Sequence, residues 1–162
     1  MSESPIAEFD LAIRSRIDIA AAPERLWPHL ARLQDWKTSV VSVERLAGEP
    51  DAEGETLRIG QRPVDVTVYT IMRTVRSVAP HWKIQTLRTE DGLMTDGYVS
   101  YSLEPEGSAT RLRCDVIARC RIALPDGFDA VEDFARLANE STLAKLDADH
   151  AALKRLVEAA QA

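Results

Sequence analysis

A small set of polar side chains falls at positions where strand or helix periodicity turns them toward the interior. They are Gln61, Thr86 and Tyr101 in predicted strands, Thr142 in a predicted helix, and Cys114 nearby in frame. A buried hydroxyl or amide without a partner costs roughly 1 to 3 kcal/mol, so these groups must bond to one another, to water or to a ligand. The set includes no carboxylate or histidine that could act as a general acid or base. Two interpretations of this set remain: an internal hydrogen-bond network, and a ligand-binding site.

Motifs for other chemistries are absent from the sequence, which has no glycine-rich phosphate loop, paired-cysteine cluster or His-Glu-x-x-His. His29, His81 and His150 lie in unrelated segments, and we expect each at the surface or at a helix edge. Asp147 and Asp149 flank His150 closely, but helical spacing spreads the three side chains around the axis. The sequence therefore predicts no metal site and no cofactor.

The two cysteines, Cys114 and Cys120, lie six residues apart in one predicted strand. At the rise of a strand they are about 20 Å apart, too far to form a disulfide bond. We expect reduced, buried, structural thiols.

A long C-terminal helix is predicted over residues 128–162, a run without glycine or proline. Its apolar stripe comprises Val131, Phe134, Ala135, Ala138, Thr142, Leu146, Leu153, Leu156 and Ala160. Such a stripe needs a partner surface, and packing on the protein's own sheet is favoured over a coiled coil. Small side chains at Ala135, Ala138 and Thr142 leave room either for close backbone approach or for a cavity.

Alternating apolar residues predict seven strands in the remaining chain. They fall at about residues 11–20, 40–43, 57–61, 64–78, 82–86, 97–103 and 111–122. In the fourth strand the alternation loses its frame, and this predicts a bulge near Thr70. In the fifth, Trp82 and Thr86 are expected to face inward.

Helical spacing replaces the strand pattern between the first two strands. Pro23 suits the first position of a helix, and Pro28 should bend or shorten it, leaving a second helical turn at residues 33–37. We expect Trp27 and Trp36 to anchor the core, because large aromatic side chains contribute much of its burial energy.

Length and composition narrow the function classes. The chain has 162 residues and a net charge of −6, which disfavours binding to nucleic acid. Its longest apolar runs are far below the roughly 20 residues that span a bilayer, and its first residues lack a signal-peptide pattern. We expect a cytoplasmic protein without an integral membrane segment.

The order strand, two short helices, six strands and one long helix resembles the START-like (SRPBCC) superfamily, which includes the birch pollen allergen relatives and the polyketide cyclase/dehydrase-type proteins. The most specific matching segments are 17–27 (IDIAAAPERLW), 35–36 (DW), 42–44 (SVE), 98–107 (YVSYSLEPEG) and 110–112 (TRL). The resemblance covers nearly the whole chain and implies an α+β helix-grip fold: a curved antiparallel sheet of about seven strands wrapped round the C-terminal helix. It implies one domain over residues 1–162, with residues 1–8 as a flexible tail.

The same resemblance implies an elongated cavity between the sheet and the C-terminal helix that holds a hydrophobic small molecule. The candidate ligand-binding residues are Trp36, Ile59, Gln61, Trp82, Thr86, Tyr101, Cys114, Phe134, Ala138 and Thr142. A carrier of a lipid, polyketide or aromatic metabolite is our first interpretation. A cofactor-free polyketide cyclase, aromatase or dehydratase is the second, and a co-chaperone-like interaction module is the third. Monomer and dimer both stay open.

Overall fold

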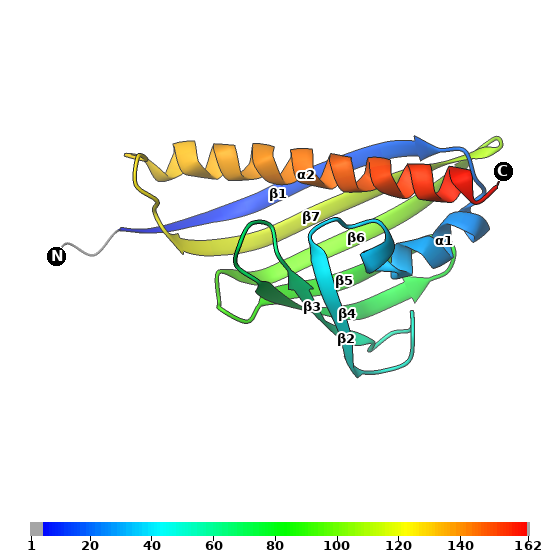
Figure 1. Cartoon of the computed structure of the whole chain (residues 1–162), viewed down its shortest axis with the longest axis horizontal. Coiled ribbons are helices and arrows are strands. Elements are labelled where there is room, and N and C mark those ends of the chain that lie inside the picture. The colour runs from blue at the N-terminus through cyan, green and yellow to red at the C-terminus, as the bar shows by residue number, and fades with distance from the viewer. Residues whose placement is uncertain (1–4, 162) are drawn as a thin grey trace.

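The computed structural model describes residues 5–161 and contains one antiparallel sheet and two α-helices (Figure 1). In chain order the elements are β1 (Ile6–Ile19), α1 (Pro23–Ala31), the 3-10 helix η1 (Leu33–Asp35), β2 (Val40–Ala47), β3 (Thr56–Gln61), β4 (Val68–Val78), β5 (Trp82–Thr89), β6 (Met94–Glu106), β7 (Ala109–Ala123) and α2 (Val131–Ala159). The predicted α+β architecture and the element order are confirmed.

The sheet has the strand order β1-β7-β6-β5-β4-β3-β2, so each strand from β2 to β7 pairs with the next one in the chain. The exception is β1, which pairs with β7 from Ile6↔Ala123 to Ile19↔Thr110. This long pairing places the N-terminal strand at the sheet edge that α2 covers, and it includes residues 6–8 of the predicted tail. Residues 1–4 lie outside the described residues.

The helix α2 runs along the sheet, packing mainly on β1, and its C-terminal part meets α1 (Figure 1). Ile19, Leu26, Leu112 and Leu153 are fully buried where these elements meet. The predicted stripe is confirmed at Leu146 and Leu153, but near the end of the helix Val157 is buried and Ala160 is exposed. No helix among residues 5–161 is long and apolar enough to cross a membrane.

Two details of β4 differ from the prediction. The strand begins at Val68, because Val64 and Val66 lie in an exposed connection after β3. The irregularity lies between Thr74 and Arg76, where the register with β5 shifts, and not near Thr70. Sequence alternation detects a break in frame, but backbone pairing decides where the extra residue goes.

Pro28 lies inside α1 without ending it, and the predicted second turn is confirmed as η1. Both predicted anchors, Trp27 and Trp36, are buried. The segment from Pro23 to Trp36 thus covers one end of the concave sheet face.

Candidate functional site

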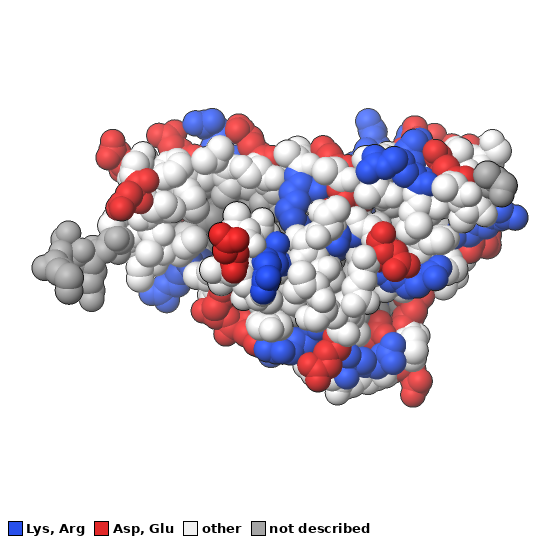
Figure 2. All heavy atoms as spheres, in the orientation of Figure 1, with Lys and Arg blue, Asp and Glu red and all other residues white. Residues whose placement is uncertain are grey.

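A cavity of about 140 Å³, partly open to solvent, lies between the concave face of the sheet and the helical segments. Apolar side chains make up most of its wall: Leu30, Ala31, Leu33, Leu57, Ile59, Met72, Leu87, Met94, Val99, Val116 and Leu146. Polar and charged side chains complete it: Lys37, Glu55, Gln61, Thr70, Lys83, Gln85 and Tyr101. Figure 2 shows a hollow on this side of the molecule, bordered mostly by uncharged atoms, beneath the N-terminal part of α2.

Three of the ten residues proposed from the sequence line this cavity, namely Ile59, Gln61 and Tyr101. Two more lie behind its wall: Trp36 is buried against His150, and Cys114 pairs across strands with Tyr101. The prediction that both cysteines are buried on one strand is confirmed.

The predicted inward orientation of Trp82 and Thr86 is wrong. Cross-strand partners share a face of the sheet, and the partner of the inward Tyr101 is Lys83. Lys83, Gln85 and Leu87 therefore face the cavity, whereas Thr86 borders a shallow groove on the outer face. The error arose because apolar residues were assumed to face inward, although β5 lines a partly polar cavity.

The three candidates from α2 lie away from the cavity, whose only lining residue from this helix within the described chain is Leu146. Phe134 packs edge-on against Phe9 and Phe128, with ring centroids 5.5 and 5.2 Å away. The Thr142 hydroxyl donates to the Ala138 carbonyl at 2.7 Å. Phe134, Ala138 and Thr142 are all partly buried, and none of them lines this cavity.

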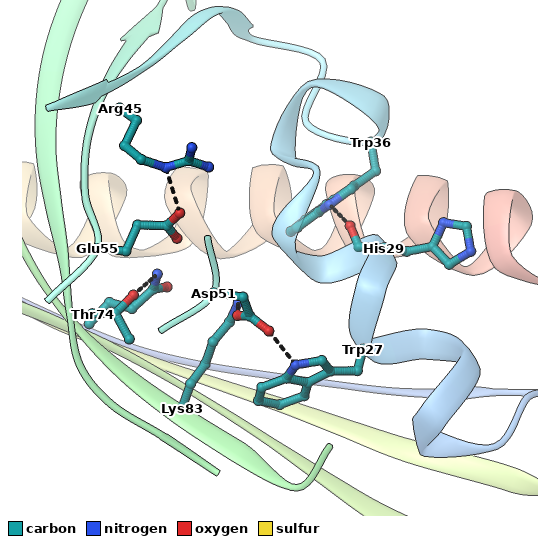
Figure 3. A network of polar contacts seen from close by, with 9 residues as sticks. Trp27, His29, Trp36, Arg45, Asp51, Glu55, Thr74 and Lys83 are labelled. Carbon is teal, nitrogen blue, oxygen red and sulfur yellow. Dashed lines mark hydrogen bonds and ion pairs between the residues drawn. The ribbon is translucent and has the colours of Figure 1, made fainter. Parts of the chain in front are cut away.

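The connection between β2 and β3, residues 48–55, brings one carboxylate, Glu55, to the cavity wall and a second, Asp51, to the cavity-lining Lys83. Gly48 has φ 80°, and a Cβ there would lie 2.7 Å from the Glu55 backbone, so the turn requires glycine. Asp51 accepts a hydrogen bond from Trp27 Nε1 at 2.5 Å and pairs with Lys83 Nζ at 3.4 Å (Figure 3). Through these two contacts Asp51 ties the loop between β2 and β3 to α1 and to β5.

Glu55 is the carboxylate that the sequence interpretation did not find. It lines the cavity, is 7% exposed, and pairs with Arg45 Nε at 3.2 Å (Figure 3). Gln85 donates to Thr74 Oγ1 at 3.2 Å on the same wall. Glu55 directly follows a glycine turn at the start of β3, and strand alternation with Leu57 and Ile59 could have placed it inward.

Lys37 and Lys83 bring two amines to the cavity wall. Burial lowers the pKa of both, against the opposing effect of Asp149 on Lys37 and of Asp51 on Lys83. Lys37 Nζ lies 3.8 Å from Asp149 Oδ2, which is longer than a hydrogen bond, and 4.8 Å from the Trp36 ring centroid. Lysines that are desolvated in this way are common at ligand and catalytic sites.

His150, expected at the surface, is 1% exposed, because α2 turns it toward β1 and the Trp36 ring. The Ser15 hydroxyl donates its hydrogen to Asp147 at 2.7 Å and lies 2.9 Å from His150 Nδ1. Nδ1 must then carry the hydrogen, which leaves Nε2 as a buried acceptor without a partner among the described residues. Burial, followed by the effect of Lys37, lowers the pKa of His150 to about 4.

This serine, histidine and aspartate do not form a hydrolase triad. In a triad the carboxylate orients the imidazole, whereas Asp147 contacts the Ser15 hydroxyl instead. Asp149, also buried, accepts from the Thr38 backbone N–H at 3.4 Å. These groups fix the position of α2 behind the wall that carries Lys37 and Tyr101.

Residues 10–158 match a family model described as polyketide cyclase / dehydrase and lipid transport. The chain belongs to this family. The match covers both helices and nearly the whole sheet, including every residue that lines the cavity. A search of curated proteins returned no match.

Solved structures confirm the START-like helix-grip fold. The Zhui aromatase/cyclase from Streptomyces sp. R1128 is 12% identical with a TM-score of 0.73, over 93% of this chain and 94% of that one. A START superfamily protein from Mycobacterium smegmatis is 19% identical with a TM-score of 0.70, over 91% and 97%. The di-domain ARO/CYC StfQ from the steffimycin pathway is 13% identical with a TM-score of 0.78, over 94% of this chain and 52% of that one. At these identities the likeness concerns the fold.

Proposed function

We propose that this protein binds a hydrophobic small molecule in the cavity beneath α1 and η1, and acts as a carrier or ligand-binding protein. The observation that supports this most is the cavity wall, where eleven apolar side chains stand beside seven polar or charged ones. Ligand sites typically combine an apolar lining with a small number of placed polar groups. The family description, which includes lipid transport, agrees with this proposal.

The size of the cavity limits the part of the ligand that it encloses. Engineered apolar cavities of about 150 Å³ bind benzene, so the 140 Å³ here suits a group the size of one ring. Larger ligands would extend through the open side or displace the wall. We therefore choose 2-phenylethanol, an uncharged molecule with a single ring, as the first probe.

The proposal is tested by titrating the protein with 2-phenylethanol in a calorimeter and repeating the titration with two neighbouring variants. Val116 lines the cavity, and Ile117 beside it on β7 is 58% exposed on the outer face. Val116→Phe should fill the cavity and weaken binding at least tenfold at little cost in stability. Ile117→Phe, the matched control, should bind like the parent. Equal binding by both variants, or none by the parent to any aromatic probe, would contradict the proposal.

A second candidate function is cofactor-free cyclisation with dehydration, and the observation that favours it is the set of proton-transfer groups on the wall. Glu55, Lys83 and Tyr101 line the cavity together, so an acid and a base are both available there. The test is conversion of 2,6-heptanedione to 3-methylcyclohex-2-enone and water, followed by the absorbance of the enone. An enzyme would produce it, and Glu55→Gln would slow it. If the enone forms no faster with the protein than without it, this second function is ruled out and only the binding function remains.

A further inference from the structure

We propose that the cavity selects a ligand with a single oxyanion, a carboxylate or an enolate, which lies against Lys37 and Tyr101 while the apolar part fills the cavity. This inference rests on the proposed binding function and adds the chemical class of the ligand. It follows from the free donors on this wall and from the balance of charge around it.

Lys37 has three N–H donors, and its amine makes no hydrogen bond of 3.5 Å or less within residues 5–161; its ion-pair partner there, Asp149 Oδ2, lies 3.8 Å away. Its side chain is only 18% exposed, and it lines the cavity. Most of the water around this ammonium has been removed while its carboxylate partner stays at 3.8 Å, and a charge that is desolvated and incompletely compensated is costly. An oxyanion in the cavity would supply the missing acceptor, and the protein has already desolvated the amine that would receive it.

Among the charged side chains around the cavity, Lys37 has the least compensated positive charge. Lys83 is paired with Asp51, and Glu55 is paired with Arg45. Asp149 is a single carboxylate shared by two amines, Lys37 at 3.8 Å and Lys145 at 3.5 Å.

His150 adds no positive charge at neutral pH, because burial keeps its pKa near 4. Lys145 is partly exposed, so solvent screens some of its charge. The Asp147 carboxylate near His150 is exposed as well and is bonded to Ser15, so the least compensated positive charge is that of Lys37, and it favours a ligand of charge −1.

Tyr101 supplies a second donor on the same wall. It is 5% exposed, and burial raises the pKa of its hydroxyl well above 10, so the hydroxyl keeps its hydrogen at neutral pH. Its neighbour is the Cys114 thiol, whose pKa burial raises to about 11. A thiol is a weak acceptor, so a ligand oxyanion would compete well for the phenol hydrogen.

Lys83 is a poorer position for the ligand's charge, although it also lines the cavity. Asp51 already contacts its amine, and the same carboxylate accepts from Trp27 Nε1 (Figure 3). A ligand anion there would face a carboxylate that the fold holds in place from two sides. The Lys83–Asp51 pair, at 3.4 Å, is closer than the Lys37–Asp149 pair, at 3.8 Å, so Lys37 is the amine with the weaker intramolecular partner.

The experiment compares two ligands that share one apolar group, phenylacetate and 2-phenylethanol, by calorimetry at pH 7.5. The parent should bind phenylacetate at least tenfold more tightly than the alcohol. Lys37→Met should remove this preference while keeping affinity for the alcohol, and Tyr101→Phe should reduce it several-fold. The matched control is Lys154→Met, which removes a lysine from α2 whose amine bonds to the Asp18 carbonyl outside the cavity. It should keep the preference.

The outcomes separate this inference from the function on which it rests. Equal affinity of the parent for both ligands, or a preference that survives in both Lys37→Met and Tyr101→Phe, would overturn the oxyanion site while leaving the cavity as a binding site. Failure of both ligands to bind the parent would overturn both proposals. If Lys37→Met does not fold, the ligand preference of the parent and its reduction in Tyr101→Phe still test the oxyanion site.

Discussion

His150 shows how a single residue can link the position of α2 to pH. It is held neutral by burial, and its unpartnered Nε2 lies among Trp36, Tyr101 and the charges of Lys37 and Asp149. Its pKa in the folded state, about 4, is below the value of 6.5 expected when unfolded. Between these values the unfolded chain binds more protons, so stability falls as pH falls.

We predict that His150 alone lowers the free energy of unfolding by about 2 kcal/mol between pH 7.5 and pH 5. Urea unfolding of the parent and of His150→Gln at both pH values measures this, since the carboxylates that also titrate are common to the two proteins. The glutamine variant should be less stable at pH 7.5 and should lose less on acidification. If both proteins lose the same free energy of unfolding between pH 7.5 and pH 5, His150 does not cause the loss.

At the scale of elements, one amide side chain of α2, Asn139, bonds to the backbone of the edge strand β1. Asn139 Oδ1 accepts the Ala12 backbone N–H at 2.9 Å, and its Nδ2 donates to the Asp10 carbonyl at 3.2 Å. The asparagine thus takes the place of a neighbouring strand for part of β1. An edge strand covered in this way is less available to pair with another chain.

We predict that Asn139→Leu costs about 1 to 2 kcal/mol of stability and exposes the Ala12 amide to hydrogen exchange. Asn139→Asp keeps the acceptor for Ala12 but not the donor to Asp10, so it should retain more protection at Ala12. Exchange measured by NMR at this amide distinguishes the two variants. Equal protection in the parent and in Asn139→Leu would mean that packing alone docks the helix.

The elements were predictable because their periodicities are local. Pro23 begins a helix, the alternation through Cys114 and Cys120 marks β7, and the unbroken run after Ala130 forms α2. The orientation of β5 was not predictable in this way, because Lys83 and Gln85 face the cavity and make the inward face the more polar one. Only the register with β6, a long-range property, decides between the faces.

At the scale of the whole molecule, the predicted fold was right and the position of the cavity along it was not determined. The sequence left open whether the small residues of α2 border a cavity or allow close backbone approach; the cavity in the structure lies beneath α1 and η1, and Leu146 is the residue of α2 that lines it within the described chain. Which part of a long helix covers a cavity depends on how the sheet curves beneath it. That curvature arises from all seven strands together.

The two locations predict different patterns of protection when a ligand binds. With phenylacetate near saturation, exchange should slow at the amides of residues 30–37 and in β3 and β5, because these segments carry most of the cavity wall. Residues 131–142 should change little, since Phe134, Ala138 and Thr142 pack toward β1 or within α2. Hydrogen exchange with mass spectrometry, with and without the ligand, measures both segments in one experiment. Protection concentrated at residues 131–142 would instead place the ligand under the N-terminal half of α2 and support those three residues as its contacts.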